Sequence, residues 1–169
     1  MKQSIFKFKK LNTWDKVTMA LYVLISIILW YYFENGTSNK TRGNILFGYS
    51  FGTQFFLYGL NYKSLRNLLV YIFWIVIGLI HLFFYFQLKD VAMFQRPGGH
   101  IATGLRNTII MLLFFQVLRF ISLKIQGQEL VCPSKYSKTD TFDDREVTQV
   151  DFFLFFIYVG MLIILLFND

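Results

Sequence analysis

The sequence predicts an all-α integral membrane protein, a bundle of about five transmembrane helices with the N-terminus inside. Three observations predict this fold: long apolar runs, an aromatic content well above that of soluble proteins, and basic residues that gather between the runs. The chain has 169 residues, of which 55% are hydrophobic and 20% aromatic, and its mean hydropathy is +0.46. We expect residues 1–169 to form a single polytopic membrane domain.

The apolar runs set the number of spans. A helix needs about 20 apolar residues to cross the hydrocarbon core, with a range of roughly 17–25. Five runs stand between polar segments, at residues 17–33, 45–60, 68–88, 108–125 and 150–167. Four of them meet this length, whereas the second is short and contains Gly, Ser, Thr and Gln residues. The alternative fold is therefore four spans plus a re-entrant segment at 45–60.

Polar segments flank and connect the runs. Residues 1–13 are basic and aromatic, which is typical of a segment that lies at lipid headgroups. Asn12 or Thr13 is expected to cap the first helix, with Asp15 in its first turn near the positive end of the helix dipole. Residues 126–149 form a polar inner loop. It is too polar to fold alone, so we expect either a solvated connection or a segment that wraps a neighbouring protein.

The distribution of basic residues predicts the topology. With five spans and the N-terminus inside, twelve of the 17 Lys and Arg residues lie in inner segments and five in outer ones. This is the direction of the positive-inside rule, and the bias nearly vanishes if 45–60 does not cross. The net charge of +7 is therefore explained by topology and anionic phospholipids rather than by nucleic acid. The expected location is an organelle or bacterial inner membrane.

Polar and small residues recur at helical spacing within four of the runs. Such stripes mark helix contacts, because small residues allow close approach and polar groups need partners away from lipid. The stripes comprise Asp15, Thr18, Tyr22 and Ser26; Gly48, Gly52 and Gly59; Tyr71, Trp74, Gly78, His81 and Tyr85; and Thr108, Gln116, Arg119 and Ser122. The predicted packing residues among them are Gly48, Gly52, Gly78, His81 and Gln116. The partner helix belongs either to this chain or to another.

Two ionisable side chains fall inside predicted spans, where such groups suggest function. His81 could serve as a proton relay, a haem ligand or a hydrogen-bond partner of a quinone. The favoured interpretation is a neutral histidine hydrogen-bonded to a tyrosine or to the backbone, since a haem would need a second embedded imidazole and His100 lies in an outer loop. Arg119 could meet a lipid phosphate or a partner's carboxylate. Snorkelling to the inner headgroups is slightly favoured.

The segment 96–106, with the sequence RPGGHIATGLR, is the most suggestive local motif. Its glycines let backbone amides turn toward an anion, and its two arginines supply charge. Arg96, His100 and Arg106, together with Arg119, are therefore the candidate lipid- or anion-binding residues. A glycine-rich turn with basic ends is the favoured alternative.

No catalytic residue is predicted, because the sequence holds no Ser-His-Asp set, no HExxH, no CxxC and no paired carboxylates. Cys132 is the only cysteine, which excludes an intrachain disulfide and a cysteine-based metal site. We expect no metal, no cofactor and no enzyme activity. No cleavable signal peptide is expected either, since the first run is longer than a typical signal core.

The leading hypothesis is a small accessory or structural subunit of a larger membrane protein complex. An energy-transducing complex, respiratory or ATP-synthesising, is a natural host, with other membrane subunits and anionic phospholipids as partners. One alternative is a lipid- or small-solute-handling membrane protein. The other is a membrane redox protein or enzyme that uses His81.

Overall fold

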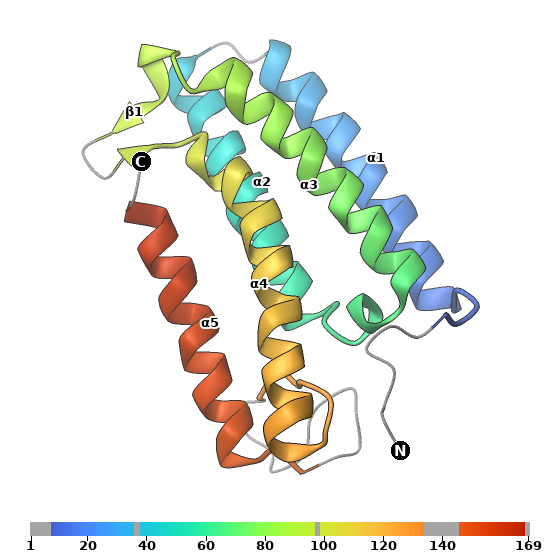
Figure 1. Ribbon diagram of the computed structural model, residues 1–169. Coiled ribbons are helices and arrows are strands. Elements are labelled where there is room, and N and C mark those ends of the chain that lie inside the picture. The colour runs from blue at the N-terminus through green and yellow to red at the C-terminus, as the bar shows by residue number, and fades with distance from the viewer. Residues whose placement is uncertain (1–7, 36–37, 97–98, 134–145, 168–169) are drawn as a thin grey trace.

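The computed structural model describes residues 8–35, 38–96, 99–133 and 146–167. Five α-helices make up most of this part of the chain (Figure 1). They are α1 (Thr13–Asn35), α2 (Asn39–Gly59), α3 (Leu68–Leu88), α4 (Thr103–Gln126) and α5 (Gln149–Phe167). The 3₁₀ turn η1 (Ser64–Arg66) precedes α3, and η2 (Ala92–Phe94) leads into an antiparallel hairpin of β1 (Gln95–Arg96) and β2 (Gly99–His100).

Four of the helices, α1, α3, α4 and α5, are long and apolar enough to cross a membrane. They cover four of the five predicted runs, so the prediction of an all-α, multi-pass membrane fold is confirmed at this level. Their outer faces carry large exposed apolar side chains, including Leu24, Phe83 and Phe153, as a surface in contact with acyl chains requires. The remaining helix, α2, is continuous over 21 residues and is less apolar than the other four.

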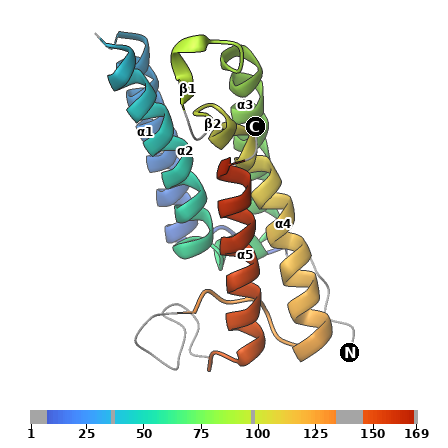
Figure 2. The ribbon, with the colours of Figure 1, turned by 90° about the vertical axis from the view of Figure 1, so that its left-hand side faces the viewer.

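The helix α4 lies at the centre of the packing. It contacts α3, α5 and α2, while α1 packs against α2. Successive helices run in opposite directions (Figure 1), and α1 and α2 lie side by side when the molecule is turned (Figure 2). The first residues of α1, α3 and α5 and the last residues of α2 and α4 are therefore at one end of the bundle, which we call the N-terminal end.

Reciprocal caps start two of the helices. At α1, Asn12 Oδ1 accepts a hydrogen bond from the Asp15 N–H at 2.6 Å, and the Asp15 carboxylate accepts one from the Asn12 N–H at 3.1 Å. At α5, Thr148 and Asp151 form the same pair of bonds, at 3.2 and 2.9 Å. Each pair satisfies backbone donors that a helix start leaves open. The cap at Asn12 follows from the sequence, whereas the one at Thr148 was missed.

The chain reverses after α4 and returns to the bundle. Gly127 ends the helix in the left-handed conformation (φ 66°), which a glycine adopts without steric cost. The following residues Leu130 and Val131 are fully buried in the main apolar core. Leu130 and Val131 therefore belong to the bundle rather than to a solvated connection. Residues 134–145 of the predicted loop lie outside the described residues.

Glycines form the closest helix contacts, but not the ones predicted for α2. A Cβ at Gly78 would lie 3.3 Å from the Ile109 Cα on α4, and one at Gly104 would lie 2.9 Å from the Ser50 Cβ on α2. Gly48 and Gly52 lie instead on the exposed side of α2, with open space beside each. These two do not mediate a helix contact within the described part of this chain. A contact with another chain stays a prediction.

Substitution of these glycines tests the packing. Gly104→Leu should lower the free energy of unfolding by about 1–3 kcal/mol or more, because the larger side chain forces α2 and α4 apart. Gly48→Leu is the matched control and should leave stability unchanged or raise it by up to ~1 kcal/mol, since leucine is the better helix former. Thermal unfolding in mild detergent measures both, and equal losses would contradict this assignment.

Candidate functional site

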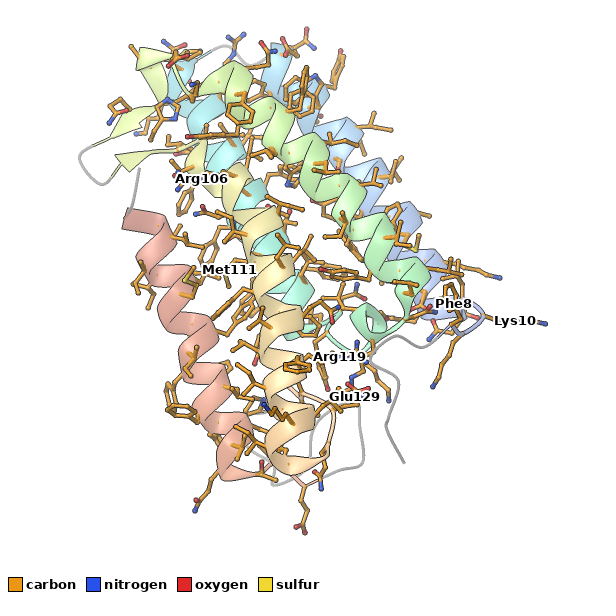
Figure 3. The ribbon with its side chains drawn as sticks, viewed as in Figure 1. Phe8, Lys10, Arg106, Met111, Arg119 and Glu129 are labelled. Atoms are coloured by element: carbon orange, nitrogen blue, oxygen red, sulfur yellow. The ribbon has the colours of Figure 1, made fainter. Side chains whose placement is uncertain are left out.

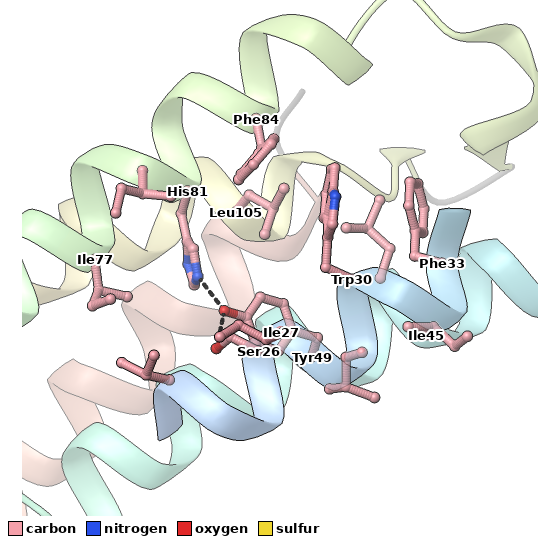
Figure 4. Close-up of a pocket in the computed structure, with 14 residues that line it drawn as sticks. Ser26, Ile27, Trp30, Phe33, Ile45, Tyr49, Ile77, His81, Phe84 and Leu105 are labelled. Carbon is pink, nitrogen blue, oxygen red and sulfur yellow. Dashed lines mark hydrogen bonds between the residues drawn. The ribbon is translucent and has the colours of Figure 1, made fainter. Parts of the chain in front are cut away.

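A cavity of about 320 Å³ lies between α1, α2 and α3 (Figure 4). Most of the 14 lining residues are aliphatic or aromatic. The side chains that bring polar atoms to the wall are Ser26, Tyr49, His81 and, through its indole N–H, Trp30. Ile27 and Ile80 line the cavity and are also exposed, at 62% and 44%. The cavity therefore opens to the apolar outer surface, between α1 and α3.

Aromatic side chains hold α1 and α3 apart. The rings of Trp30 and Phe84 meet with centroids 4.2 Å apart, and those of Tyr22 and Trp74 meet at 4.6 Å. Trp30 and Tyr22 are eight residues, or about two helical turns, apart on α1. The two ring contacts therefore act as spacers along the pair of helices. The cavity lies along this pair of helices, from Val23 to Phe33 of α1.

A polar cluster from four helices lies at the floor of the cavity, where three of its members, Ser26, Tyr49 and His81, line the wall. We define it as Tyr22 and Ser26 of α1, Tyr49 and Thr53 of α2, His81 of α3 and Thr108 of α4. His81 Nε2 lies 2.8 Å from the Tyr49 hydroxyl, and His81 Nδ1 lies 3.1 Å from Thr108 Oγ1. The Tyr49 hydroxyl is also 2.8 Å from Ser26 Oγ (Figure 4). His81 is thus hydrogen-bonded to a tyrosine, as the favoured interpretation of the sequence expects.

One set of donors for the hydroxyl groups of α1 and α2 agrees with the distances. Ser26 donates to the Tyr22 carbonyl and Thr53 to the Tyr49 carbonyl, each at 2.7 Å. Because the proton of Thr53 is committed, its oxygen accepts from the Tyr22 hydroxyl at 2.8 Å. Ser26 Oγ likewise accepts from the Tyr49 hydroxyl.

The tautomer of His81 then follows from the same count. Tyr49 has given its proton to Ser26, so the 2.8 Å contact with His81 requires a proton on Nε2. Nδ1 is then the acceptor, and Thr108 donates to it at 3.1 Å. In this arrangement each of the six protons of the cluster has a protein acceptor. The Tyr49 oxygen faces both His81 and, at 3.1 Å, the Tyr22 hydroxyl, so Ser26 Oγ is the lining oxygen that keeps a lone pair in this arrangement.

In the segment 96–106, the predicted anion-binding residues His100 and Arg106 make local contacts within the protein. His100 Nδ1 accepts from the Ala102 N–H and Nε2 lies 3.2 Å from the Val91 carbonyl, so its ring braces the turn before α4. The Arg106 guanidinium lies over the Tyr85 ring at 5.5 Å. The side chain of Arg96 is outside the described residues. This geometry fits the alternative interpretation, a structured turn with basic ends.

Arg119 does not snorkel, contrary to the slight preference drawn from the sequence. It is fully buried, and its guanidinium meets the Glu129 carboxylate through two bonds, Nε–Oε2 at 2.6 Å and Nη2–Oε1 at 2.8 Å (Figure 3). Gln116 Oε1 lies 3.4 Å from Arg119 Nη1. The predicted carboxylate partner thus comes from this chain, because the reversal at Gly127 brings Glu129 back to α4. Arg119 is engaged internally rather than with lipid.

Sequence reasoning found part of the cavity floor and missed the rest. The stripes on α1, α3 and α4 contain Tyr22, Ser26, His81 and Thr108. Tyr49 is not predicted, because the spacing of the glycines in α2 favours the opposite side of this helix. The signal was the spacing of Tyr49 and Thr53, four residues apart and hence on one face. No group of three or more His, Cys, Asp or Glu side chains able to hold a metal ion occurs in the ranges that the structure describes.

Comparison of the chain with protein-family models, with curated protein sequences and with solved structures finds no match.

The buried ion pair yields a stability prediction. Glu129→Gln should lower the free energy of unfolding by about 3–5 kcal/mol, since it leaves the Arg119 charge buried without its counter-charge. The double variant Arg119→Met/Glu129→Leu should recover most of this loss, because the fully buried Arg119 charge is then removed as well. Glu34→Gln, at an exposed site, is the control and should change little. If Arg119 reached the headgroups instead, Glu129→Gln would behave like this control in thermal unfolding.

Proposed function

We propose that this chain is a multi-pass membrane protein that binds an uncharged, largely apolar molecule carrying a hydroxyl group. The cavity between α1 and α3, with its polar floor, is the observation that supports this function. A surface groove filled only by acyl chains needs no polar floor, and an ionisable side chain within membrane helices marks a candidate functional site. This is the lipid- or small-solute-handling hypothesis, with the binding site in the cavity rather than in the segment 96–106.

The composition of the wall argues for an uncharged ligand. None of the lining residues is Asp, Glu, Lys or Arg. A charged group placed among aliphatic and aromatic side chains would lose its hydration without gaining a counter-charge. The apolar body of the ligand would instead replace acyl chains between α1 and α3, entering from the side that faces lipid.

The proton count argues for a hydroxyl group. In the arrangement above, Ser26 Oγ keeps a lone pair while its own proton and that of Tyr49 are donated within the protein, so a ligand gains most by bringing a donor. The carbonyl oxygen of a ketone has lone pairs but no proton, so it cannot donate a hydrogen bond to Ser26 Oγ. Trp30 could still donate its indole N–H to either ligand, which is why the two must be compared directly.

We also propose that α2 crosses the membrane, giving five spans with the N-terminus inside. Its 21 residues would extend about 30 Å at the usual helical rise, the thickness of the hydrocarbon core. Its buried polar residues Ser50, Thr53 and Gln54 face the bundle rather than lipid. The positive-inside count supports this orientation.

Bromine quenching of Trp30 tests the cavity. The probes are 11-bromoundecan-1-ol, 11-bromoundecan-2-one and 1-bromoundecane, added to the purified protein in mild detergent. We expect the alcohol to quench at a concentration about 2- to 12-fold lower than the bromoalkane, the ratio for one hydrogen bond of roughly 0.5–1.5 kcal/mol. Trp30→Phe should remove this quenching, which separates Trp30 from the other tryptophans.

A serine variant tests the role of the cluster. Ser26→Ala removes the acceptor of the Tyr49 proton, so the preference should shift from the alcohol toward the ketone. Ser50→Ala is the matched control on α2, because Ser50 bonds to the Phe47 carbonyl and does not line the cavity. Equal quenching by all three probes in every variant would remove the hydroxyl proposal, and no saturable quenching would remove the cavity as a site.

An accessory subunit of a larger membrane complex is the second candidate function. The exposed side of α2 favours it, since Gly48 and Gly52 leave open space beside the exposed rings of Phe51 and Phe55. Small residues of this kind allow another helix to approach closely. Other membrane subunits are the partners that this function proposes, and an energy-transducing complex stays the proposed host. No enzyme activity is part of either proposal.

The second candidate predicts a defined assembly. Tagged protein extracted in mild detergent should migrate on a native gel within a larger complex of constant composition, identified by mass spectrometry. Gly48→Leu/Gly52→Leu should release it from that complex, while Gly160→Leu on α5, also with open space, serves as the control. Migration of the unmodified chain as a single 20.1 kDa protein would contradict the subunit function.

A further inference from the structure

A second hollow, unrelated to the cavity, lies at the N-terminal end of the bundle. Its volume is about 470 Å³. It is bounded by the segment before α1, the end of α2, η1 and the start of α3, and we call it the basic hollow. Its charged residues are the lysines Lys9, Lys10 and Lys63, one carboxylate, Asp15, and Arg66, whose guanidinium also lies 4.0 Å from the Glu129 carboxylate. This excess of positive charge within one concave site is the first observation that points to an anion.

The carboxylate of Asp15 is buried and hydrogen-bonded within the protein. It is only 3% exposed, it accepts from Ser64 Oγ at 2.5 Å, and it closes the cap with Asn12. Lys9, Lys10 and Lys63 are exposed. The carboxylate of the site is therefore engaged with protein donors, and the three lysine side chains are accessible from outside the protein.

The backbone around the hollow is held in place by polar side chains. Asn67 donates to the Lys9 carbonyl at 2.9 Å and accepts from the Leu69 N–H at the start of α3. Arg66 donates to the Leu130 carbonyl at 2.8 Å. The segment that carries Lys9 and Lys10 is thus tied to α3. A bound anion does not have to order this segment, which favours binding.

The surroundings of the hollow indicate an anion that belongs to the membrane. Phe8, Trp14 and Leu60 are exposed beside the lysines, at 76%, 47% and 45%. Figure 3 shows Phe8 and Lys10 together at the corner where α1 begins. Aromatic and basic side chains mixed at the start of a span are typical of the headgroup level of a bilayer. Apolar side chains beside cations match a molecule with both a phosphate and acyl chains.

We propose that the basic hollow binds the phosphate of an anionic membrane phospholipid. The ammonium groups of Lys9, Lys10 and Lys63 surround the phosphate, and the first acyl carbons lie against Trp14 and Leu60. The site is independent of the cavity between α1 and α3, since the two share no lining residue. Its ligand is also different in kind, a charged lipid at the headgroup level rather than an uncharged molecule within the bundle.

Native mass spectrometry of the full chain tests this site. The protein is released from nanodiscs of phosphatidylcholine with a minor fraction of phosphatidylglycerol, and retained lipids are counted. We expect one retained phosphatidylglycerol. Lys9→Gln/Lys10→Gln/Lys63→Gln should lower its retention at least tenfold, since each lysine near an anionic headgroup contributes about fivefold. The substitutions are at exposed positions, and size-exclusion elution with circular dichroism verifies that the variant is folded.

A charge-matched control separates a site from diffuse attraction. Lys40→Gln/Lys89→Gln/Lys124→Gln removes the same charge from three exposed lysines outside the hollow, and Lys124 is at the same end of the bundle. This triple variant should change retention less than twofold. Equal losses in the two triple variants, or retention of phosphatidylcholine equal to that of phosphatidylglycerol, would overturn the proposal.

A competition experiment distinguishes the two possible sources of a phosphate group. Inorganic phosphate at millimolar concentration should neither displace phosphatidylglycerol nor raise the thermal stability of the unmodified protein. If it does both, and fails to do so in the Lys9/Lys10/Lys63 variant, the hollow binds free phosphate and the lipid assignment is wrong.

Discussion

Lipid offers no hydrogen bonds, and this constraint shapes the structure more than any other. A polar group on a membrane helix has to find its partner inside the protein or at the headgroups. Three features of the structure meet this requirement. They are the polar cluster of His81, the pairing of Arg119 with Glu129, and the reciprocal caps at Asn12 and Thr148. Helix α4 takes part in the first two of these, and it also lies at the centre of the packing. The bundle is therefore organised by where its polar groups meet.

The same constraint explains which parts of the fold can be predicted from the sequence. In α1, α3 and α4 the polar residues stand out against apolar runs, so their spacing predicts the buried face, and the buried positions of Asp15, Thr18, His81 and Thr108 follow. In α2 small and polar residues occur on both sides of the helix. Spacing alone cannot then decide which side faces the bundle, and the glycines indicated the wrong one for contacts within this chain.

Other features depend on distances that no local pattern contains. The pairing of Arg119 with Glu129 requires the reversal at Gly127 to bring a residue ten positions later back beside α4. The cavity requires the spacing of α1 from α3, which is set by the ring contacts of Trp30 and Tyr22 with partners on α3. The candidate residues of the segment 96–106 were chosen by composition, and composition does not distinguish a site from a braced turn. The tertiary arrangement decides each case.

The polar cluster also has a consequence for how the protein is made. Helices that enter a membrane in chain order meet their partners in that order, and the six members of the cluster are distributed over the first four helices. Tyr22, Ser26, Tyr49 and Thr53 can bond to one another as soon as α1 and α2 lie side by side. The imidazole of His81 then joins with α3, but its Nδ1 stays without the Thr108 proton until α4 follows. During biogenesis, the interval between insertion of α3 and of α4 is the period in which this imidazole depends on a water molecule, a lipid or the insertion machinery for its missing bond.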